Sequence, residues 1–148
     1  MDSKETFSFL ERELAMFVRR AEATRIANLK YNEMERSTYL LLLHLEENGP
    51  MGIKALSEAF QLDLSTLSRQ TAALESKNYV ERKTDPADAR INLLSITKEG
   101  QTQLNEVREQ RREFYTHLLK EWEMDDCETF AVLLEKFNQT VVRYKRSK

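Results

Sequence analysis

Hydrophobic residues recur at steps of three and four along most of the chain, which predicts a mainly helical protein. The first such stretch follows two cap candidates, Asp2 and Ser3. Its apolar residues share one helical face: Phe7, Leu10, Leu14, Phe17 and Ala21. A second stretch runs from about Glu33 to Glu47 and contains five successive apolar residues, as expected of a helix packed on several sides. Asn48-Gly49-Pro50 is a typical stop signal after it.

Two short helices are expected next, followed by a β-hairpin. The first helix covers residues 54–60, and Asp63 is placed to cap the second, which reaches about Lys77. About three residues separate them, as in a helix-turn-helix. The apolar side of the second short helix is expected to hold Leu64, Leu67, Thr71 and Leu74. Residues 79–84 alternate loosely and residues 90–96 are rich in strand formers, which predicts two strands. The turn between them, Asp85-Pro86-Ala87-Asp88, predicts a projecting tip longer than a two-residue turn.

The C-terminal third predicts two further helices. Thr97 caps a helix that reaches about Trp122, and Asp125 with Glu128 forms an acidic capping box for the last one. The last helix carries one apolar face: Phe130, Leu133, Leu134, Phe137, Val141 and Tyr144. The expected fold class is mainly α, with six helices and a small β-hairpin wing. A chain of 148 residues has too little core to cover both terminal helices, so their apolar faces are expected to dimerise.

Composition narrows the class of protein. Only 3 Gly and 2 Pro disfavour a turn-rich all-β fold, and the short apolar runs and the N-terminal residues indicate neither a membrane span nor a signal peptide. With a single cysteine, a cytoplasmic location is the expectation. The net charge of −2 gives no hint of a nucleic-acid partner. Residues 54–98 nevertheless carry seven basic and six acidic residues, so the acidic excess lies elsewhere in the chain.

A helix-turn-helix followed by a β-hairpin is the winged-helix arrangement, in which the second short helix enters a DNA major groove. That helix has no acidic residue from Leu64 to Leu74. Its outward side is expected to hold Ser65, Arg69, Ala72, Ala73 and Ser76, with Thr66, Ser68 and Gln70 on the flanks. The hairpin adds Arg82, Lys83 and Arg90, and Asp88 is expected to be tied to Arg90 or to backbone donors. These residues predict contacts with base edges and with the DNA backbone.

The stretch from Asp85 to Gly100 resembles the wing signature of the MarR family, the multiple-antibiotic-resistance regulators. It has an Asp-x-Arg, a Leu-rich strand and a Thr-x-x-Gly that opens the next helix, and residues 63–75 resemble the family's recognition helix. The resemblance covers nearly the whole chain. It implies a transcriptional regulator, either a repressor or an activator with repression favoured, that binds pseudo-palindromic DNA as an obligate homodimer. One departure is Gln61, which stands where such turns often have glycine.

The resemblance also implies a domain organisation and a set of DNA-binding residues. The single subunit, 1–148, would contain a winged helix-turn-helix lobe at 33–100 and dimerisation helices at 1–32 and 101–148. The DNA-binding residues would be Ser65, Thr66, Ser68, Arg69, Gln70, Arg82, Lys83, Asp88 and Arg90. A small aromatic ligand is a further possible partner, and its pocket would be lined by Phe17, Tyr31, Tyr39 and His44.

Other functions remain open at this stage. A helical protein-interaction module would need neither the acid-free helix face nor an arginine at the hairpin. An oxidant sensor would use Cys127, whose neighbours Asp125 and Asp126 disfavour a reactive thiolate. No metal site or cofactor is expected from two histidines and one cysteine. No nucleophile–base pair, phosphate-binding glycine loop or carboxylate pair indicates an enzyme.

Overall fold

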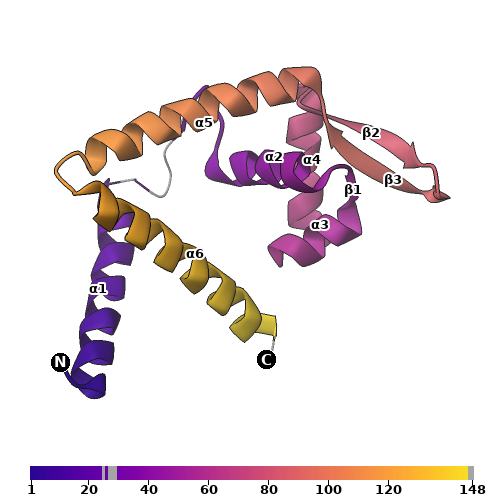
Figure 1. The fold of residues 1–148 in the computed structure, drawn as a ribbon. Coiled ribbons are helices and arrows are strands. Elements are labelled where there is room, and N and C mark those ends of the chain that lie inside the picture. Colours follow the sequence, from indigo (N-terminus) through magenta and orange to yellow (C-terminus); the bar gives the residue numbers. More distant parts are fainter. Residues whose placement is uncertain (25, 27–29, 147–148) are drawn as a thin grey trace. The chain divides into compact units, whose positions relative to one another are not determined.

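The computed structural model describes residues 1–24, 26 and 30–146. Residues 25 and 27–29 of the expected N-terminal dimerisation segment lie outside that description. The helices are α1 (Ser3–Thr24), α2 (Arg36–Asn48), α3 (Ile53–Phe60), α4 (Leu64–Ser76), α5 (Lys98–Leu118) and α6 (Met124–Arg146), and the strands are β1 (Met51–Gly52), β2 (Val80–Asp85) and β3 (Asp88–Ile96) (Figure 1). The described chain thus has the six helices and the hairpin that the pattern predicts. It forms two compact units, residues 1–110 and 111–148.

The core of the first unit lies where α2, α3, α4, the hairpin and the first half of α5 meet. Its most enclosed side chains are leucines and a valine, each less than 2% exposed: Leu41, Leu42, Leu56, Leu67, Leu74, Leu94, Leu104 and Val107. Burial of each such side chain stabilises the fold by about 2 kcal/mol. This core fixes α4 and the hairpin to one scaffold, so their exposed surfaces have a defined relation.

Local capping explains several of the helix ends. In α1, Asp2 Oδ1 accepts from the Glu5 N–H at 2.8 Å and Glu5 Oε2 accepts from the Asp2 N–H at 3.1 Å, which is a reciprocal capping box. Gly49, with φ of +78°, closes α2 through its N–H to the Leu45 carbonyl. Gln61 also adopts the left-handed conformation, at φ of +54°. The turn between α3 and α4 therefore has the backbone that glycine often supplies, without a glycine.

Three helix boundaries differ from the sequence prediction. Helix α2 begins at Arg36 rather than Glu33, because Asn32 and Glu33 have positive φ in a tight turn that pairs Tyr31 with Met34. Helix α5 ends at Leu118, four residues before the predicted end. Helix α6 begins at Met124, which places Asp125 inside the first helical turn, so the prediction that it opens the helix is wrong.

The sheet has three antiparallel strands in the order β1-β3-β2. The sequence did not predict β1, which is only two residues long and pairs with Leu93 and Leu94. The predicted long hairpin turn is also wrong, since Asp85 pairs with Asp88 across a two-residue turn. The Ala87 N–H donates to Asp85 Oδ1 at 2.9 Å and closes this turn. A register shift follows, because Thr84 pairs with Asn92, and β3 therefore bulges at residues 89–91.

The junction between the hairpin and α5 depends on a buried glycine. Thr97 caps α5 by accepting the Gly100 N–H at 2.9 Å, as predicted, and its hydroxyl donates to the Asn78 carbonyl. A Cβ atom on Gly100 would lie 2.1 Å from the Tyr79 carbonyl oxygen. Only glycine fits this close approach of two backbone segments.

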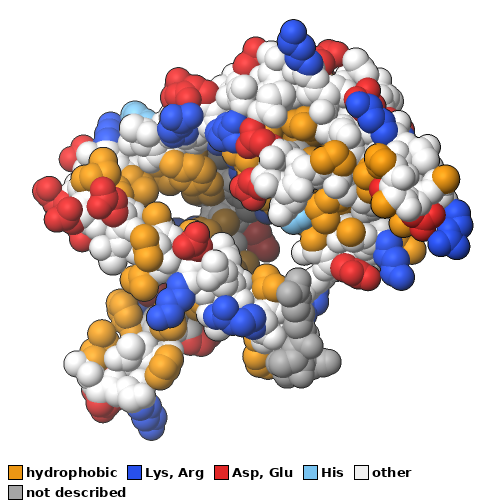
Figure 2. Space-filling view, turned by 45° about the vertical axis from the view of Figure 1, so that its right-hand side comes forward, with side chains coloured by type: hydrophobic (Ala, Val, Ile, Leu, Met, Phe, Trp, Pro, Cys, Tyr) orange, Lys and Arg blue, Asp and Glu red, His pale blue; other side chains and the backbone are white. Residues whose placement is uncertain are grey.

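Helices α1 and α6 expose many large apolar side chains, and hydrophobic atoms are prominent at the molecular surface (Figure 2). On α1, Phe7 is 66% and Phe17 60% exposed, and on α6, Leu133 is 56% and Phe137 41% exposed. No helix in the described part of the chain has an apolar stretch that could cross a bilayer. Packing within each unit therefore does not account for these two exposed apolar faces.

Candidate nucleic-acid interface

Helix α4 has a buried face and a polar exposed face. Leu67, Thr71 and Leu74 are at most 1% exposed and hold the helix to the core. The opposite side carries small or polar exposed residues: Ser65, Ser68, Arg69, Ala72, Ala73 and Ser76. The flanking Thr66 and Gln70 are half-buried. The predicted orientation of the helix is thus confirmed, except that Leu64, placed on the apolar side, is 54% exposed.

Asp63 organises the first turn of α4. Its Oδ1 accepts from the Thr66 N–H at 2.7 Å and from the Ser65 hydroxyl at 2.8 Å. The backbone N–H of Thr66, and then the Ser65 and Thr66 hydroxyls, lower the pKa of the Asp63 carboxyl to about 2. The carboxylate is therefore charged at neutral pH, next to the exposed face of α4.

A shallow depression lies between α4 and the start of α2. Its α4 side includes Arg69, Gln70 and Lys77, and its other side includes Glu33 and Glu35. The Gln70 Oε1 atom is buried and has no hydrogen-bond partner among the described residues. The two glutamates make this side of α4 less favourable for a phosphate group.

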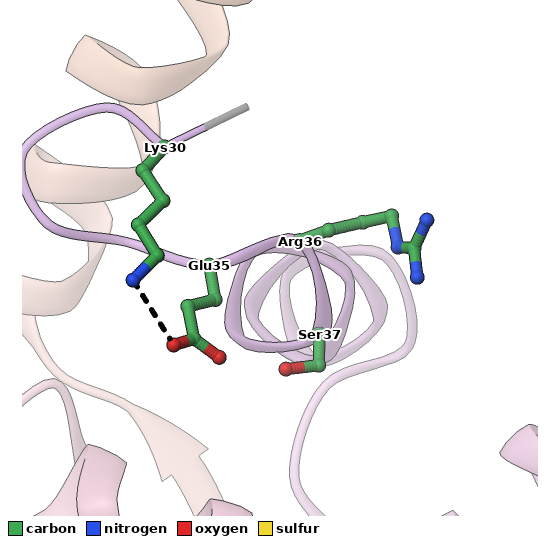
Figure 3. A pocket seen from close by; sticks show the side chains of 4 residues that line it. All are labelled: Lys30, Glu35, Arg36 and Ser37. Atoms are coloured by element: carbon green, nitrogen blue, oxygen red, sulfur yellow. Dashed lines mark ion pairs between the residues drawn. The ribbon is translucent and has the colours of Figure 1, made fainter. Parts of the chain in front are cut away.

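A second depression beside it shows how one of those glutamates is neutralised. Lys30 Nζ lies 3.4 Å from Glu35 Oε1, and the two side chains point toward one another (Figure 3). Arg36 extends away from this pair, from the first residue of α2 (Figure 3). Both charges of the Lys30–Glu35 pair are more than half exposed, so the pair adds little to stability.

The wing presents a fixed guanidinium. Arg90 Nε and Nη2 lie 3.1 Å and 3.0 Å from the two Asp88 carboxylate oxygens, and the Arg90 N–H also donates to Asp88 Oδ1 at 3.0 Å. These bonds lower the pKa of Asp88 and raise that of Arg90. Asp88 is tied as the sequence predicts. The Arg90 side chain stays 89% exposed, on the bulge of β3.

The other two basic residues of the wing are paired as well. Arg82 Nε lies 2.8 Å from Glu75 Oε1, which connects β2 to the last turn of α4. Lys83 Nζ lies 3.1 Å from Glu81 Oε1, and its side chain is 66% exposed. Arg82 therefore fixes the wing against α4, a role that the sequence did not indicate, since nothing in a pattern pairs residues 75 and 82.

The four residues of the predicted ligand pocket have other surroundings in the described structure. Tyr31 and Tyr39 are half-buried against the core. The His44 ring lies edge-on to Phe60, with 5.1 Å between the ring centroids. Phe17 lies on the exposed face of α1. Ligand binding by these residues stays a prediction.

Sequence reasoning missed a polar connection between α2 and α5. Arg108 Nη1 and Nη2 lie 2.7 Å and 3.1 Å from the two Glu46 carboxylate oxygens, and Gln101 donates to the same carboxylate. The Arg108 and Gln101 hydrogen bonds lower the pKa of Glu46. Arg108 also donates to Asn105 Oδ1 at 2.6 Å. The only signal in the sequence was the spacing of Gln101, Asn105 and Arg108 along one helix. Their partner Glu46 could not be predicted, because it is 62 residues away from Arg108.

A helix pair whose second member exposes an acid-free polar face beside an arginine-bearing hairpin defines a winged helix-turn-helix protein. The family model described as "MarR family" matches residues 34–91. The HTH-type transcriptional regulator YxaD of Bacillus subtilis, itself uncharacterised, is 42% identical over 142 residues, which cover 96% of this chain and 99% of YxaD. The chain belongs to the MarR family of helix-turn-helix transcriptional regulators and is not an enzyme.

Solved structures show the same fold. A MarR family protein from Bacillus stearothermophilus superposes with a TM-score of 0.75 at 20% identity, covering 95% of this chain and 99% of that one. The transcriptional regulator BldR from Sulfolobus solfataricus gives a TM-score of 0.72 at 23% identity, covering 97% and 99%. The six helices and the antiparallel hairpin sheet are thus the family's architecture.

Proposed function

We propose that the protein is a repressor that binds a pseudo-palindromic operator as a homodimer. The observation that carries this proposal is the exposed face of α4, where Arg69 stands among small and hydroxyl side chains without an acidic residue. Such a face allows close approach to base edges in a major groove. Two copies related by a dyad would match half-sites about one helical turn of DNA, or ~34 Å, apart.

The roles of the site residues follow from their chemistry. Arg69 has the fork of donors that suits the O6 and N7 acceptors of guanine. Ser65, Thr66, Ser68 and Gln70 supply contacts to bases or phosphates along the same helix. Arg90 enters the neighbouring minor groove, and Lys83 lies along the backbone. Asp88 and Arg82 hold the wing in shape through their ion pairs with Arg90 and Glu75.

The exposed apolar residues of α1 and α6 support dimerisation. Large apolar patches on a monomer mark interaction surfaces. In this proposal the lobe is 33–100, and the segments 1–32 and 101–148 form the dimer. We further propose that the protein acts in the cytoplasm, where its DNA partner lies.

A small aromatic ligand would release the DNA by changing the distance between the two α4 helices. Such a ligand acts only if it binds the two spacings with different affinity. Phe17, Tyr31, Tyr39 and His44 are the proposed lining, because their rings have the chemistry to stack on an aromatic ligand.

Selection of bound duplexes from a random pool tests the DNA proposal. The expected result is an enriched two-fold-symmetric sequence, and Arg69→Ala should then weaken binding by about 1–3 kcal/mol and relax preference at one guanine of each half-site. Failure to enrich any sequence would overturn the proposal. It would instead favour a protein-interaction module.

A further inference from the structure

The direction of one hydrogen bond at the start of α4 is fixed by chemistry. The Ser65 hydroxyl and Asp63 Oδ1 are 2.8 Å apart, and the carboxylate also accepts the Thr66 N–H at 2.7 Å. Three hydrogen-bond donors hold the pKa of Asp63 at about 2, so the carboxylate carries no proton at neutral pH. An ionised carboxylate is acceptor-only. Ser65 must therefore be the donor.

This bond leaves the Ser65 oxygen with lone pairs only. A hydroxyl has one proton and two acceptor sites, and here the proton is already used. Ser65 is exposed, and it is the second residue of the helix. In helix-turn-helix proteins the N-terminal residues of the recognition helix contact the base edges. Ser65 thus presents an acceptor where the base edges lie.

The negative charge of Asp63 also favours hydrogen-bond donors on the DNA over acceptors. DNA groups that are electron-rich, such as phosphate oxygens, guanine O6 and N7 and thymine O4, are repelled by a carboxylate close by. The exocyclic amino groups are attracted, and in the major groove only adenine N6 and cytosine N4 carry them.

We propose that Ser65, held by Asp63, selects a base with an exocyclic amino group, adenine or cytosine, in each half of the operator. This inference rests on the proposed DNA-binding function and specifies its substrate at one position. Arg69, four residues further on the same exposed face, has donors only and selects the opposite chemistry. Each half-site should therefore contain an amino-bearing base and a guanine, recognised by side chains one helical turn apart.

Base selection with the wild-type protein and three variants is the first test. The wild-type protein should enrich adenine or cytosine at one position that Arg69→Ala leaves unchanged, and Ser65→Ala should lose about 3- to 10-fold of that preference, the effect of one neutral hydrogen bond. Asp63→Asn keeps a capping residue but removes the charge, and it should admit guanine or thymine there. Preserved helical circular dichroism in all three variants shows that the lobe still folds.

Deletion of the amino group from the DNA is the sharper test. In the enriched duplex, the adenine or cytosine is replaced by the analogue that lacks only its exocyclic amine. The wild-type protein should lose about 3- to 10-fold in affinity, and Ser65→Ala should lose clearly less, because only the attraction by the Asp63 charge remains. An equal loss in both proteins overturns the inference, as does a position that responds to Ser65→Ala but holds guanine or thymine. Either result would leave an enriched operator and hence the proposed function intact. Absence of any enriched sequence would instead remove the proposed function together with this inference.

Discussion

At the scale of single residues, the ion pair between Asp88 and Arg90 in the wing orients the guanidinium but adds little stability. The Arg90 side chain is 89% exposed, and exposed pairs contribute little to the free energy of unfolding. The pair does restrict where the guanidinium points, because both carboxylate oxygens hold it. A pre-oriented arginine loses less conformational entropy when it meets DNA.

Replacement of Arg90 should therefore affect DNA more than folding. Arg90→Ala should weaken binding to all sequences by a similar factor and lower the salt dependence, the slope of log K against log[salt], by about one. Arg143→Ala, on the exposed surface of α6, is the matched control and should leave the slope unchanged. Titrations at four salt concentrations measure both. An unchanged slope for Arg90→Ala would place the wing away from the DNA backbone.

Asp63 gives a pH dependence whose sign follows from its lowered pKa. The folded pKa of about 2 lies below the ordinary value of 3.8, so the carboxylate stabilises the fold above about pH 4, and this stabilisation is lost as the pH falls towards 2. Asp63→Ala should lower the melting temperature at pH 7, and the gap to the wild-type protein should narrow as the pH drops through that window. A gap that stays constant down to pH 2 would contradict the charged cap.

Local side-chain chemistry was predictable from the sequence at several of these residues. Asp63 and Thr97 were predicted as caps and Asp2 was one of two candidates, because each acts on a partner only three residues away. The Asp88–Arg90 pair is equally local. Glu46 with Arg108, and Glu75 with Arg82, join different elements, and only the folded chain brings them together.

At the scale of elements, helices were predicted well where apolar residues recur with helical spacing. They were predicted less well where the backbone adopts non-helical angles. Asn32 and Glu33 take up left-handed conformations that few non-glycine residues adopt, so the start of α2 was misplaced. Strand β1 has two residues, too short for any periodicity. The two-residue turn after Asp85 was missed because its register depends on a bulge in the opposite strand.

The junction of the hairpin and α5 should be the most sensitive backbone contact in the lobe. Gly100→Ala places a methyl group 2.1 Å from the Tyr79 carbonyl oxygen, and overpacking of this kind costs about 2 kcal/mol or more. Gly52→Ala is the matched control, since its Cβ would meet only ordinary contacts at 3.5 Å and beyond. Denaturant unfolding measures both free energies. Equal stabilities for the two variants would show that the junction yields easily.

At the scale of the whole molecule, the terminal helices expose apolar residues that a monomer leaves in water. Two substitutions on α6 separate this surface from its polar side. Phe137→Glu adds a charge to the apolar face, whereas Gln139→Glu adds the same charge two positions away. The first should give a monomer in sedimentation velocity and reduce operator affinity by more than about 10-fold, because one half-site alone binds weakly. The second should remain a dimer. A dimeric Phe137→Glu would place the interface elsewhere.

The ion pair between Glu46 and Arg108 couples the orientation of α5 to that of α2. This pair and the Gly100 junction attach the first half of the helix to the lobe that carries α4. The 21 residues of α5 extend about 31 Å, so a tilt of about 5° displaces one end by about 3 Å relative to the other. That displacement is close to the ~3.4 Å rise of one base pair. In the proposed complex with DNA, such a tilt of α5 would move the attached α4 by about one base pair relative to its half-site, without any change inside the lobe itself.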